Sequence, residues 1–94
     1  YAVFGSQALS ESIVTALGAR YQACLMANHG MLAGGPSLAR ALWLAEEVET
    51  LAHQYALACQ IGRPAILDAA AMNAVQAGFA GYGPGSTTHA EPSE

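Results

Sequence analysis

The sequence predicts an α/β fold, and three observations support this prediction. Short apolar runs of strand length alternate with longer segments in which apolar residues recur every three or four positions. Three of the longer segments follow a residue that can cap a helix, namely Ser6, Ser37 and Asp68. Breaks rich in glycine and proline separate the elements. With 94 residues, the chain is long enough for one small domain.

Residues 1–4 are aromatic or small and β-branched, which suits the tail of a strand or an extended lead-in segment ended by Gly5. Ser6 is the predicted N-cap of a helix over residues 7–19. The apolar residues of this segment fall on one helical face, which indicates an amphipathic helix: Leu9, Ile13, Val14 and Leu17.

A pair of strands is predicted next. Residues 23–27 form an apolar run that is too short for a typical helix and is consistent with a strand buried on both faces. The run resumes at 31–33, after a polar break formed by Asn28, His29 and Gly30. The pattern predicts that this break is a turn or a bulge.

The longest predicted element is a helix over residues 38–60, capped by Ser37 and carrying a wide apolar face. A third helix is expected over residues 69–77 or slightly beyond, after Asp68. Two or three short strands cannot form a well-covered sheet alone. We therefore expect further strands from an absent segment or a partner chain.

Composition excludes several functions. The formal charge is −4, with three arginines and no lysine, so a nucleic-acid footprint, a Schiff-base lysine and a P-loop lysine are all excluded within this chain. No apolar run is long enough to span a membrane, and no signal peptide is recognisable. The chain lacks an initiator methionine, so we expect that it was cut from something longer. Cys24 and Cys59 are predicted to be buried free thiols that act as small hydrophobic residues, which indicates a reducing, cytoplasmic location.

Few residues of the sequence are candidates for a catalytic or metal site. His29 lies at the end of a predicted strand, where a ligand is well placed, but zinc needs at least three protein ligands. His53 is predicted to be a surface or interface residue, and His89 lies in a tail that is expected to be disordered. Tyr82, between two glycines, is either a packing anchor or a proton donor that closes over a site. The acidic residues of the long helix are predicted to form a solvated face: Glu46, Glu47 and Glu49.

Five stretches of the sequence together resemble the class II aldolase/adducin family. They are residues 1–6 (Tyr-Ala-Val-Phe-Gly-Ser), 9–11 (Leu-Ser-Glu), 27–30 (Ala-Asn-His-Gly), 41–49 (Ala-Leu-Trp-Leu-Ala-Glu-Glu-Val-Glu) and Phe79 with 81–83 (Gly-Tyr-Gly). The His-Gly step alone is weakly specific, but the step and the helix motif together are fairly specific. The likeness is greatest to the family branch that cleaves fuculose 1-phosphate.

The resemblance implies a fold and a chemistry. The fold would be the C-terminal part of a three-layer α/β/α domain with a central, mainly antiparallel sheet, and it would occupy residues 1–83. His29 would be one of three histidine ligands of Zn²⁺, the other two coming from a His-x-His motif in the missing N-terminal half. Tyr82 would take part in proton transfer. The parent protein would be a homotetramer that performs zinc-assisted retro-aldol cleavage of a ketose 1-phosphate to dihydroxyacetone phosphate and an aldehyde.

Alternatives within and beyond this chemistry stay open. The same family contains zinc-dependent epimerases, decarboxylases and dehydratases, and also the non-catalytic assembly module of adducin. Because this chain has one of the three expected ligands, we expect no aldolase activity from the 94 residues alone. Residues 84–94, rich in small and polar residues, are expected to be a disordered tail.

Overall fold

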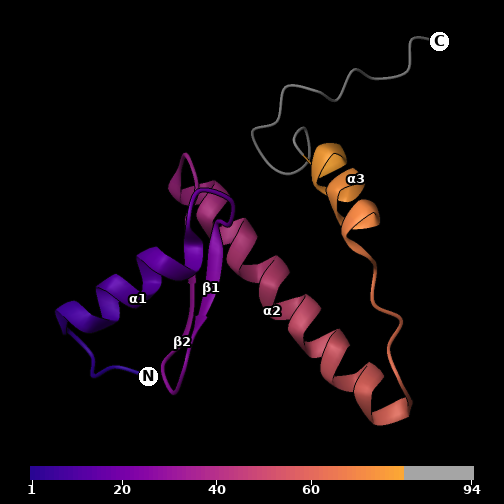
Figure 1. The fold of residues 1–94 in the computed structure, drawn as a ribbon, viewed down its shortest axis with the longest axis horizontal. Coiled ribbons are helices and arrows are strands. Elements are labelled where there is room, and N and C mark those ends of the chain that lie inside the picture. Colours follow the sequence, from indigo (N-terminus) through magenta and orange to yellow (C-terminus); the bar gives the residue numbers. More distant parts are fainter. Residues whose placement is uncertain (80–94) are drawn as a thin grey trace, which may run out of the picture. The chain divides into compact units, whose positions relative to one another are not determined.

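The computed structural model describes residues 1–79 of the chain, and within them it contains three helices and two strands (Figure 1). The elements are α1 (Gln7–Leu17), β1 (Ala23–Met26), β2 (Gly30–Ala33), α2 (Leu38–Ile61) and α3 (Ala69–Phe79). The chain divides into two compact units, of which the first is Tyr1–Thr50 and the second begins at Leu51. The α/β class is confirmed, whereas the three-layer architecture stays a prediction.

The first unit is built around a β-hairpin. Strands β1 and β2 pair antiparallel, with Ala23 opposite Ala33 and Met26 opposite Gly30. Helix α1 packs against β1, as Figure 1 shows. Both predicted strands are therefore present, and the polar break between them is a turn, as one of the two readings of the sequence proposed.

The segment before α1 forms no strand. Residues 1–3 lie outside regular structure, and the amide of Ser6 donates to the carbonyl of Val3 at 3.2 Å, which closes a turn. Gly5 takes the positive φ of 70° that this turn requires. Ser6 then caps α1 as predicted, because its Oγ accepts the amide hydrogen of Leu9 at 3.2 Å. The helix ends at Leu17, two residues before the predicted end.

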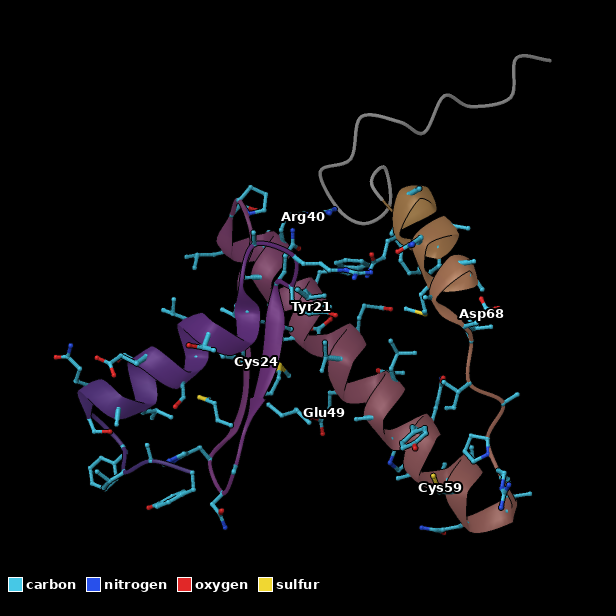
Figure 2. The ribbon with its side chains drawn as sticks, viewed as in Figure 1. Tyr21, Cys24, Arg40, Glu49, Cys59 and Asp68 are labelled. Carbon is cyan, nitrogen blue, oxygen red and sulfur yellow. The ribbon has the colours of Figure 1, made fainter. Side chains whose placement is uncertain are left out.

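Helices α2 and α3 begin at the two other predicted caps. The Oγ of Ser37 accepts the amide hydrogen of Arg40 at 3.1 Å, and Oδ1 of Asp68 accepts that of Ala71 at 2.8 Å. Helix α2 has 24 residues and is therefore about 36 Å long. Figure 2 labels Asp68 at the start of α3. Local hydrogen bonding thus fixes where each helix begins.

Loss of the Asp68 cap should destabilise α3. We expect Asp68→Ala to cost about 1 kcal/mol of helix stability, because the amide of Ala71 loses its acceptor. Asp68→Asn is the matched control, since an amide oxygen caps as well as a carboxylate. Hydrogen exchange at the Ala71 amide measures the effect. Equal protection in the alanine and asparagine variants would contradict the assigned cap.

No side chain is buried among residues 1–79. Leu25 in β1 is 75% exposed, so the prediction of a strand buried on both faces is wrong for the described chain. The reason is that the described sheet has two strands and that α1 is the helix packed on it. Several large apolar side chains of α2 are also exposed: Leu38, Leu42, Leu51, Tyr55, Leu57 and Ile61. None of the helices in residues 1–79 combines the length and apolarity needed to cross a membrane.

Candidate functional site

The turn between β1 and β2 carries His29. The amide of His29 donates to the carbonyl of Met26 at 2.9 Å, which closes a four-residue turn. Asn28, the third residue of that turn, has a positive φ of 67°, the conformation that a type II turn requires there. Asparagine tolerates this conformation better than most residues. The sequence therefore folds into a turn that presents His29 at the end of the hairpin.

Gly30 follows His29 and has a φ of 137°, which side-chain-bearing residues rarely adopt. A Cβ added here would meet no atom within 4 Å, so the constraint comes from the backbone and not from space. Glycine at this position lets the chain pass directly from His29 into β2.

Replacing Gly30 should loosen the turn. We expect Gly30→Ala to destabilise the hairpin by about 1–3 kcal/mol, because alanine is strained at this backbone conformation. Asn28→Gly is the matched control, since glycine accepts a positive φ without strain. Hydrogen exchange of the amides in the β1–β2 ladder measures both variants. An alanine variant as well protected as the wild type would rule out the strain argument.

The ring of His29 has two contacts with the segment that precedes α1. Its Nε2 lies 2.7 Å from the carbonyl oxygen of Ala2. Its ring is stacked on that of Tyr1, with the centroids 5.5 Å apart and the planes 11° from parallel. Because a carbonyl can only accept a hydrogen bond, Nε2 must carry the hydrogen. A histidine held in this way by a backbone carbonyl is typical of metal-binding histidines.

One imidazole does not make a metal centre. Among residues 1–79, no group of three His, Cys, Asp or Glu side chains lies close enough together to hold an ion. Zinc sites in enzymes use three protein ligands. His29 therefore fits the role of a single ligand, and the described residues do not complete the set.

The other candidate residues lie on α2 or outside the described residues. His53 is exposed on α2, as predicted for a surface residue. The acidic residues of α2 are exposed as well, in agreement with a solvated face: Glu46, Glu47 and Glu49. Tyr82 and His89 lie outside the described residues, as do residues 84–94, for which disorder was predicted.

Both cysteines are free thiols on different elements, but the prediction that they are buried is wrong for the described chain: Cys24 is half-buried and Cys59 is exposed. Cys24 is in β1, and Cys59 is near the C-terminal end of α2 (Figure 2). A hydrogen bond with Cys59 raises the pKa of Tyr55, one helical turn earlier in α2, and repulsion between the two ionised groups adds to the effect. The spacing of four residues could have shown this pair in the sequence.

Sequence patterns could not show the contacts of His29. Tyr1 and Ala2 are far from His29 along the chain, and no spacing rule joins a lead-in segment to a hairpin turn. Only the packing of α1 against β1 brings them together.

Comparison with known proteins places this chain in a family. A family described as "Class II Aldolase and Adducin N-terminal domain" matches residues 1–56, more than half of the chain and the part that contains His29. No solved structure matches the chain.

Curated relatives are similar over much of this chain. The 5-methylthioribulose-1-phosphate/5-deoxyribulose-1-phosphate aldolase of Rhodospirillum rubrum is 47% identical over 88% of the chain. The L-fuculose phosphate aldolase of Escherichia coli K12 is 45% identical over 68% of it. The 5-deoxy-D-ribulose 1-phosphate aldolase of Bacillus thuringiensis is 35% identical over 88% of it. The chain spans 37%, 29% and 38% of these relatives. The matched family, together with these identities, shows that the chain belongs to the class II aldolase and adducin family.

Proposed function

We propose that this chain is part of a zinc-dependent sugar-phosphate aldolase. The reaction is the reversible retro-aldol cleavage of a ketose 1-phosphate, such as fuculose 1-phosphate, to dihydroxyacetone phosphate and an aldehyde. The observation that carries the proposal is His29, which lies on a constrained turn, within the family match, with one ring nitrogen hydrogen-bonded to a backbone carbonyl. The names of the relatives support a phosphorylated ketose as substrate.

In this proposal His29 binds the metal ion as one of three histidine ligands. When bound, zinc supplies Lewis-acid polarisation of the substrate oxygens. The hairpin contributes rigidity, since the turn hydrogen bond and the paired strands fix the backbone on both sides of the ligand. The remaining ligands are proposed to come from the N-terminal part of the catalytic domain, because the described residues include no group of three potential ligands.

The residue content of the chain supports metal-dependent rather than Schiff-base chemistry. The chain has three arginines and no lysine, so it contains no amine side chain that could form an imine with the substrate carbonyl. Tyr82 is proposed as a proton donor to the aldehyde oxygen, a role that its phenol group can fill.

We also propose an oligomeric state, a cellular location and a domain assignment for the protein. The exposed apolar side chains of α2 support an assembly in which other segments and subunits cover them, such as a homotetramer. The two free thiols on separate elements support a cytoplasmic location. Residues 1–83 are proposed as the C-terminal portion of the catalytic domain.

Two measurements test the proposed function. The isolated 94-residue chain should show no retro-aldol turnover with added zinc, because it supplies one ligand. A chimera in which residues 1–83 replace their counterparts in the Rhodospirillum rubrum relative should cleave a ketose 1-phosphate. Tyr82→Phe in the chimera should lower kcat by about 10²-fold. A well-folded, zinc-loaded chimera without aldolase activity would refute the proposal.

Product analysis separates the alternatives. A zinc enzyme of the same family with epimerase, decarboxylase or dehydratase activity would return a different product from the same assay. A non-catalytic module like that of adducin would return none. The relatives, whose names all state an aldolase activity, favour the aldolase.

A further inference from the structure

We draw no further inference here: the strongest candidate, the exposed apolar side chains in the C-terminal half of α2 (Leu51, Tyr55, Leu57 and Ile61), carries none because nothing in the described residues shows what covers them.

Discussion

Replacing His29 by alanine should lower the zinc affinity of the chimera by at least about 10²-fold. Zinc sites with four ligands contribute about 10–16 kcal/mol, so one ligand accounts for roughly 3 kcal/mol, which is a factor of about 10² in affinity. The loss should not be repaired locally, because residues 1–79 include no group of three potential metal ligands. Activity at limiting zinc should fall at least as far.

The controls for His29→Ala separate loss of a ligand from loss of folding. His53→Ala removes an exposed imidazole from α2 and should leave zinc affinity and turnover unchanged. His29→Gln keeps a polar side chain at the turn and should still lose zinc, since an amide is a poor zinc ligand. Zinc content of the purified variants and circular dichroism complete the comparison. A His29→Ala chimera that retains full zinc affinity would exclude His29 from the metal site.

The isolated 94-residue chain should not unfold in a cooperative transition. Folded domains of this size have a net free energy of unfolding of about 5–14 kcal/mol, and burial of apolar side chains is its main favourable source. No described side chain of this chain is buried. The helices are held mainly by their own hydrogen bonds and caps. A thermal scan by circular dichroism should therefore show a broad, gradual loss of helix.

The chimera is the control for this prediction, because there the apolar faces have the rest of the fold to pack against. It should unfold in a sigmoidal transition, and a dye that binds exposed apolar surface should bind the isolated chain more strongly than the chimera. A sharp transition of the isolated chain that is independent of protein concentration would contradict the prediction.

Local patterns predicted the elements well, because their causes lie within a few residues. Ser6, Ser37 and Asp68 cap the three helices through hydrogen bonds to amides three residues later, which their positions already indicated. The polar break at Asn28 and His29 is a turn because its backbone geometry is determined within four residues.

Features that depend on distant segments were not predictable. The apolar run of β1 indicated a buried strand, yet Leu25 is exposed, because burial requires layers that the described residues do not provide. The placement of the His29 ring depends on Tyr1 and Ala2, which reach it through the packing of α1 on β1. Two features of the sequence pointed to His29 itself: its neighbours Asn28 and Gly30, which form the polar break with it, and the family resemblance.

The short connection between β1 and β2 also determines which contacts form first during folding. Three residues separate the strands, so the hairpin can close on the timescale of about 1–10 μs that is typical of such elements. The contact between Ala2 and His29 closes a much longer loop, and its chain-entropy cost makes it a later event. We therefore expect the turn to form before the lead-in segment docks onto its imidazole. A nascent chain would thus have the backbone of His29, its proposed metal ligand, in place before the ring meets Ala2.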